Sequence, residues 1–204
     1  MPAHKDYAVA WICALPLEMA AAKAMFDENH DRLPQSANDS NTYAFGQISG
    51  HNVVITCLSK GVYGATAAAT VVSQMRSTFA AIRFGLMVGI GGGVPCGDHD
   101  IRLGDIVVGK PTNNSSGVLQ YDHGKLLSGG RFQHVGMLNQ PPQVLLTAIG
   151  HLESNSMIKK GRNISDIVSS VLSNNVDMKQ KFSRPALQHD LLLKGRIRSP
   201  RVQR

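Results

Sequence analysis

A single carboxylate lies where a helix is expected to begin. Residues 14–19 are Ala-Leu-Pro-Leu-Glu-Met, and Pro16 suits the first turn of a helix, so Glu18 falls within that turn. The apolar run at residues 7–14 predicts a strand just before it, and ligands usually bind at the carboxyl end of a strand in an open α/β sheet. Glu18 could therefore act on a ligand bound there, or it could simply complement the helix dipole. From this segment alone, the second interpretation is favoured.

Two glycine-bearing segments could bring bare backbone close to a ligand. Residues 61–64, Gly-Val-Tyr-Gly, precede an expected helix whose N–H groups could hold an anion or a sugar hydroxyl; a plain turn explains them equally well. Residues 89–94, Gly-Ile-Gly-Gly-Gly-Val, follow an expected buried strand and could approach something flat or anionic. A dinucleotide site would need a helix to start there. Residues 95–100 instead predict a turn, which argues against a nucleotide-dependent oxidoreductase and leaves a tight β-turn as the structural alternative.

Metal and cofactor chemistry find little support in the sequence. Asp98, His99 and Asp100 lie near Cys96, but these residues share one turn, and no second pair elsewhere has the spacing of metal ligands. We therefore expect a solvated loop, with no metal and no cofactor. The three cysteines are odd in number and predict free thiols in a reducing compartment, the cytoplasm.

The elements that must position these residues alternate between strands and helices. A polar loop is expected at residues 29–42, and residues 118–121 are weakly strand-like. The connections are short, which predicts an α/β fold: a single domain with a mixed central sheet flanked by helices. Strands are expected at residues 7–14, 43–48, 53–58, 84–88 and 106–108, and helices at residues 17–28, 65–75, 143–152 and 164–172.

The formal net charge of +7 is concentrated at the C-terminus. The last eleven residues contain five of the 21 basic residues and no acidic one, which leaves 16 basic against 14 acidic residues elsewhere. A nucleic-acid surface would spread over a folded face with aromatic residues between the charges, so we expect residues 191–204 to be a disordered tail and nucleic acid not to be a partner. No apolar stretch is long enough to span a membrane, and no secretory leader is visible.

Taken together, these segments resemble the purine nucleoside phosphorylase/uridine phosphorylase superfamily. The likeness is greatest to the methylthioadenosine/S-adenosylhomocysteine nucleosidase-like domains of fungal multidomain proteins of NLR or ankyrin-repeat type. It implies a nucleoside phosphorylase-like domain over residues 7–190 that cleaves the N-glycosidic bond of purine nucleosides or nucleotides, in nucleoside metabolism or nucleotide-based signalling. The resemblance rests on residues 11–19, 61–64, 84–94 and 101–108, and extends to 130–133 and 141–146.

The resemblance also implies roles for individual residues. Glu18 matches the carboxylate that activates water in the nucleosidases. The phosphorylases carry a Gly-Asp-Pro segment with a phosphate-binding Arg near this point, which the sequence lacks, so hydrolysis is favoured and phosphate is the co-substrate of the alternative. Val62 is expected on the 5′ side of the nucleoside. The residues expected to line the sugar and base are Leu15, Ile90, Gly91 and Gly92.

Two further motifs of that family have no counterpart in this sequence. One is a Met-Glu pair that grips the ribose hydroxyls, and the other is an Asp that protonates purine N7. We therefore expect a C-terminally truncated domain with an exposed sheet edge and marginal stability as a monomer. A catalytically inactive nucleoside-binding or interaction module is the alternative to an enzyme. Members of this family are commonly homo-oligomers, and the same is expected here.

Overall fold

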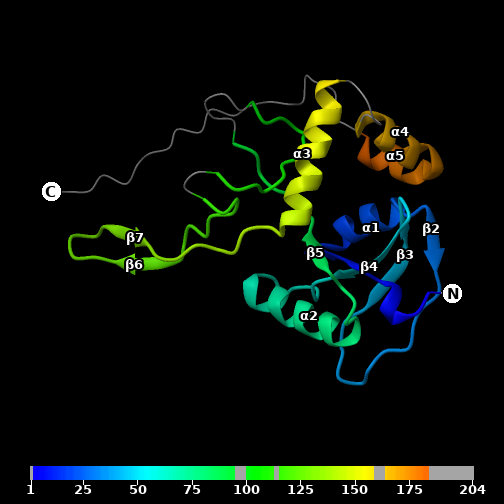
Figure 1. Ribbon diagram of the computed structural model, residues 1–204, viewed down its shortest axis with the longest axis horizontal. Helices are drawn as coiled ribbons and strands as arrows, with labels where there is room; N and C mark the ends of the chain where they lie inside the picture. Colours follow the sequence, from blue (N-terminus) through cyan, green and yellow to red (C-terminus); the bar gives the residue numbers. More distant parts are fainter. Residues whose placement is uncertain (1, 95–99, 113–114, 159–163, 184–204) are drawn as a thin grey trace.

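A five-stranded mixed sheet forms the core of the fold (Figure 1). The computed structural model describes residues 2–94, 100–112, 115–158 and 164–183. The strand order is β2-β3-β4-β1-β5, in which β1 pairs in parallel with β4 and β5, while β3 pairs antiparallel with β2 and β4. The expected mixed α/β fold is confirmed. The strands are β1 (Val9–Cys13), β2 (Glu28–His30), β3 (Tyr43–Ile48), β4 (His51–Cys57) and β5 (Phe84–Met87).

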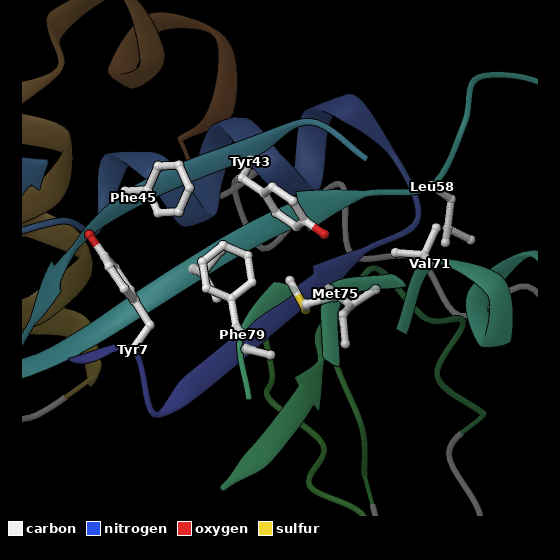
Figure 2. Close-up of a cluster of buried hydrophobic side chains, with 10 residues drawn as sticks. Tyr7, Tyr43, Phe45, Leu58, Val71, Met75 and Phe79 are labelled. Atoms are coloured by element: carbon white, nitrogen blue, oxygen red, sulfur yellow. The ribbon is translucent and has the colours of Figure 1, made fainter. Parts of the chain in front are cut away.

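Two helices pack on opposite faces of this sheet. Alternate side chains of β1 point to opposite faces, so each helix covers a different set of them. Helix α1 (Pro16–Ala24) packs over the face that holds Val9 and Cys13. Helix α2 (Ala65–Thr78) packs over the face that holds Ala10 and Ile12, where aromatic rings fill the core (Figure 2). The buried side chains of that second cluster are Tyr7, Ala10, Ile12, Tyr43, Phe45, Val54, Leu58, Val71, Met75 and Phe79.

The expected β3–β4 hairpin is confirmed, and its turn is tight. Ile48 pairs with His51, so only Ser49 and Gly50 connect the strands. Both have positive φ, 49° and 81°, as the two central positions of a type I′ turn require.

A buried carboxylate fastens the loop before β3 to α2. Asp39 accepts hydrogen bonds from the Tyr43 hydroxyl at 2.8 Å, from the Asn41 N–H at 3.0 Å and from the Thr78 hydroxyl. Burial by itself would raise the pKa of Asp39, but these hydrogen bonds outweigh it and hold the pKa below its ordinary value. The loop therefore has a charged anchor in the core, although its sequence predicts only turns.

The C-terminal half packs loosely against the sheet. It contains α3 (Gln143–Met157), α4 (Ile164–Asn174), α5 (Val176–Phe182) and the hairpin of β6 (Gly124–Leu126) and β7 (Phe132–His134). No side chain of α3 or α4 is buried, and the hairpin extends away from the main sheet in Figure 1. The expected helices at residues 143–152 and 164–172 are confirmed. Within the described ranges, no helix has both the length and the apolar character needed to cross a membrane.

Several expectations about the strands are wrong. Glu28–His30 is a strand rather than part of a helix and loop, because α1 ends at Ala24 and Phe26 packs against Gly46, which brings the chain alongside β3. β5 is an edge strand whose side chains alternate between half-buried and exposed, and not the buried strand that its apolar sequence suggests. Residues 118–121 form no strand.

The expected strand at residues 106–108 is also not formed. Its three side chains are 65%, 72% and 54% exposed, although β-branched residues of this kind favour strands. A strand forms only where a neighbouring strand supplies hydrogen bonds, and this segment pairs with none of the described strands. The expected basic tail lies outside the described residues.

Candidate active site

Three parallel strands end at one edge of the sheet. Each is followed by a segment that the sequence indicates as chemically relevant: residues 14–19 after β1, residues 61–64 shortly after β4 and residues 89–94 shortly after β5. Ligands in open α/β sheets bind outside the carboxyl ends of such strands. This edge is therefore the candidate active site.

Glu18 connects two of these segments through its carboxylate. Oε2 accepts hydrogen bonds from the N–H groups of Ala14 and Leu15 at 2.8 and 2.9 Å, and Oε1 accepts one from the N–H of Ile90 at 2.7 Å. Leu15 is the residue that precedes the first turn of α1, so this side chain caps its own helix while it holds the glycine segment after β5. A carboxylate offers about four acceptor positions, which leaves room for one further donor.

The same contacts set the charge of Glu18. Partial burial would raise its pKa, but the hydrogen bonds from the N–H groups of Ile90, Leu15 and Ala14 outweigh burial and hold the pKa below its ordinary value. The carboxylate is therefore ionised at neutral pH. An ionised carboxylate with a lowered pKa is suited to orienting a water molecule or stabilising a nearby positive charge, and less suited to keeping a proton.

Gly89 allows the carboxylate to occupy this position. A Cβ atom added at Gly89 would lie 2.7 Å from Oε1 and 3.0 Å from Cδ of Glu18, closer than any side chain could tolerate without movement. The sequence indicates the glycine segment as a candidate for ligand binding but does not single out Gly89 within it. The only sequence signal for Gly89 is its place shortly after an expected strand. Because four of the five residues at 89–93 are glycines, the sequence does not tell which glycine lies next to Glu18.

The structure brings together only some of the residues predicted for the site. Leu15 and Ile90 contact Glu18 through their backbone N–H groups, while their side chains are exposed. Gly91 and Gly92 face open space, with nothing within 4 Å of an added Cβ. Val62 is 57% exposed in the turn after β4, where its N–H donates to the Ser59 carbonyl at 3.0 Å. The roles of these residues toward a ligand stay predictions.

Two neutral thiols lie beside the carboxylate. Cys13 and Cys57 are in register on β1 and β4, and both are free, as expected. Burial, followed by the neighbouring Cys57 thiol and the Glu18 carboxylate, raises the pKa of Cys13 to about 12. Burial, followed by Glu18, also raises the pKa of Cys57. Thiols in this state are poor nucleophiles at neutral pH, so neither cysteine is expected to supply a nucleophile at this edge.

An open cavity of about 360 Å³ lies next to the site, between α1 and the end of β4. It is lined by Pro16, Met19 and Lys23 of α1 and by residues that include Asn41 and Ser59, but Glu18 and the glycine segment do not line it. Because the cavity has no acidic group, we place the candidate chemistry at Glu18 and regard the cavity as neighbouring space.

Only part of the turn that was considered as a metal site lies within the described residues. Cys96, Asp98 and His99 lie outside the described residues, and Asp100 forms an ion pair with Arg102 at 2.8 Å. Across the part of the chain that the structure describes, no group of three or more His, Cys, Asp or Glu side chains is placed to hold a metal ion.

Comparison with known proteins finds similarity to part of a fungal protein. The chain is 46% identical over 191 residues to a protein of Hyaloscypha variabilis named "Nucleotide-binding leucine-rich repeat (NLR)-like protein". The match covers 93% of this chain and 19% of the relative, so the chain spans about a fifth of the length of the curated relative that it matches. No family model matches the chain, and no solved structure matches it. The chain therefore has a homologous segment in a fungal NLR-like protein.

Proposed function

We propose that this chain is a nucleosidase-type domain of the nucleoside phosphorylase superfamily, which hydrolyses the N-glycosidic bond of purine nucleosides or nucleotides. The observation that supports this most is the Glu18 carboxylate, which is ionised, held by three backbone N–H groups, and left with one acceptor position at the carboxyl ends of parallel strands. The similarity to an NLR-like protein agrees with a domain of a larger signalling protein, although the relative's name describes a chain of which only 19% is matched.

In the proposed reaction, a water molecule donates a hydrogen bond to Glu18. The water oxygen bonds to C1′ of the sugar as the bond from C1′ to N9 breaks, and the electron pair of that bond goes to the purine. The proton lost by the water leaves through the carboxylate, and the purine takes up a proton as it departs. The products are the free sugar and the free base, so one water molecule is consumed for each bond cleaved.

The negative charge of Glu18 would also stabilise the transition state. The sugar becomes positively charged as the glycosidic bond breaks. At a separation of about 5 Å and an effective dielectric constant of about 20, two opposite unit charges attract by roughly 3 kcal/mol. Since partial charges develop, a contribution of about 1 to 3 kcal/mol is reasonable, which corresponds to about a five- to 150-fold change in rate.

The glycine segment would complete the site. Gly91 and Gly92 have open space where side chains would stand, so a flat purine or a sugar could lie directly against their backbone. The segment is held in place by the hydrogen bond from Ile90 to Glu18, so in this proposal the same carboxylate would position the binding surface and face the reacting sugar.

A second candidate function is a nucleoside-binding or interaction module without turnover. The observation in its favour is that Glu18 already has a structural task, because three of its acceptor positions serve the backbone. Binding without product would identify this case.

The experiment is to measure free base by HPLC after incubation with adenosine, methylthioadenosine, inosine or ATP, with and without phosphate. We expect base release that needs no phosphate and falls about a hundredfold or more in Glu18→Gln. Glu28→Gln is the matched control, because this exposed carboxylate on β2 lies away from the site. Release only with phosphate would identify a phosphorylase, and titration calorimetry with adenosine that shows binding but no product would favour the second function.

A further inference from the structure

A second cavity lies on the other face of the sheet, between α2 and the edge strand β5. Its volume is about 310 Å³, near the lower end of the range for small-molecule sites. None of its residues contacts the Glu18 carboxylate. We name it the α2–β5 pocket, and its lining residues are Ala10, Ile12, Val72, Met75, Arg76, Ile82, Arg83, Phe84 and Gly85.

The pocket owes part of its space to a glycine inside a strand. A Cβ atom at Gly85 would lie 3.5 Å from Cδ1 of Ile12 and 3.8 Å from Cβ of Ala10, which are ordinary contacts. A small side chain would therefore fit at Gly85, and a large one would fill the pocket. Glycine weakens a strand and often marks a place where a ligand approaches the backbone closely. Packing therefore does not require the residue at position 85 to lack a side chain.

Two arginines border this apolar space. Arg76 lies in the last turn of α2, and Arg83 comes immediately before β5, where its N–H donates to the Ala8 carbonyl at 2.9 Å. Both side chains are exposed, and neither guanidinium forms an ion pair with any described residue. No lining residue is acidic. Arg76 could act on the helix dipole alone, but Arg83 has no such role.

We propose that the α2–β5 pocket binds a small amphiphilic carboxylate, with its apolar body against β1, β5 and α2 and its carboxylate on Arg76 and Arg83. Arginine presents a planar fork of N–H donors that matches a carboxylate. The apolar residues that line the pocket would supply the hydrophobic contribution. This ligand would occupy a site separate from that of the nucleoside, so the proposal stands whether or not the chain cleaves nucleosides.

The test uses octanoate as the probe, with octanol and octylamine as neutral and cationic analogues. Binding is measured by calorimetry and by methyl NMR shifts at Met75 and Ile82. We expect saturable octanoate binding that is at least about tenfold tighter than that of octanol and weakens with added salt. Octanoate that binds no better than octanol, or that does not bind saturably, would overturn the proposal.

Arginine variants locate the carboxylate. Arg76→Gln and Arg83→Gln should each weaken octanoate binding by about five- to tenfold and leave octanol binding unchanged. Arg32→Gln is the control, because Arg32 is exposed in the loop that follows β2, at the opposite edge of the sheet from β5. Octanoate affinity that is the same in all three variants would show that the arginines do not hold the anion and would contradict the proposal.

Variants of Gly85 locate the apolar body. Gly85→Leu should abolish binding of octanoate and octanol alike, while Gly85→Ala should keep it in weakened form. Native-like binding by a folded Gly85→Leu protein would refute the assigned position, and if that variant does not fold, the arginine variants decide. Glu18→Gln should bind octanoate as the wild type does, which separates this proposal from the nucleosidase proposal.

Discussion

Replacing Gly89 with alanine tests whether the Glu18 carboxylate truly holds the glycine segment. The new Cβ would stand 2.7 Å from Oε1 of Glu18, a distance that real contacts do not show. Either the carboxylate, which is the end of a flexible side chain, or the segment must move, and we expect either movement to weaken the 2.7 Å hydrogen bond from the Ile90 N–H. Losing a hydrogen bond to a charged group costs about 1.5 to 3 kcal/mol.

The expected net loss is smaller, because alanine also restricts the unfolded chain. That effect stabilises the protein by about 0.4 to 1 kcal/mol where the backbone accepts alanine. Gly89→Ala should therefore lower the free energy of unfolding by about 1 to 2 kcal/mol, equivalent to a decrease in Tm of roughly 2–8 °C for a chain of this size. Urea and thermal unfolding measure it directly.

The same segment supplies its own controls. Gly91 and Gly92 have nothing within 4 Å of an added Cβ, so Gly91→Ala and Gly92→Ala should be neutral or slightly stabilising. A double-mutant cycle adds a second check: in a Glu18→Ala background, the cost of Gly89→Ala should disappear, since the clashing group is gone. The reasoning fails if Gly89→Ala is as stable as Gly91→Ala, or if its cost persists without Glu18.

Two further predictions follow from the charges at this edge of the sheet. The pKa of Glu18 is lower in the folded state than its ordinary value, so the stability that Glu18 contributes is present above the unfolded pKa and is lost as pH falls through the folded pKa. The difference in unfolding free energy between wild type and Glu18→Gln should therefore be constant near neutral pH and shrink below about pH 4.5. Urea unfolding at a series of pH values measures it. A constant difference down to pH 3 would contradict this, and Asp39 does not interfere because both proteins contain it. The pKa of Cys13 is raised to about 12 from 9.0, which implies about a thousandfold smaller thiolate fraction. In a Cys96→Ser variant, the native protein should therefore react far more slowly with an aromatic disulfide reagent than the urea-unfolded protein does. Equal reaction rates would refute this prediction.

The elements with strong local signals were predictable from the sequence. The hairpin of β3 and β4 has alternating apolar residues around a short turn at Ser49 and Gly50, and α1 starts with a proline in its first turn. Both patterns depend only on neighbouring residues. Glu18 was predictable for the same reason, since its place in the helix follows from Pro16.

The features that depend on distant partners were not predictable. The strand Glu28–His30 forms because β3 offers it hydrogen bonds, and its polar sequence gives no sign of this. The apolar residues at 106–108 predicted a strand, yet no described strand pairs with them. In the same way, the contact between Gly89 and Glu18 joins residues 71 positions apart, and composition alone cannot tell which glycine makes it.

The structural task of Glu18 and its proposed chemical task place different demands on one carboxylate, and its lowered pKa shows how both could be met. Three N–H donors make the carboxylate a weak base, so it would contribute to hydrolysis through its charge and its orientation of water rather than by retaining a proton. Protonation would release the Ile90 N–H as well as remove that charge. If protonation of Glu18 slows base release, the rate should therefore fall only below the ordinary glutamate pKa of 4.5. A decrease in rate near neutral pH would have to come from the titration of another group, such as the acid that protonates the departing purine.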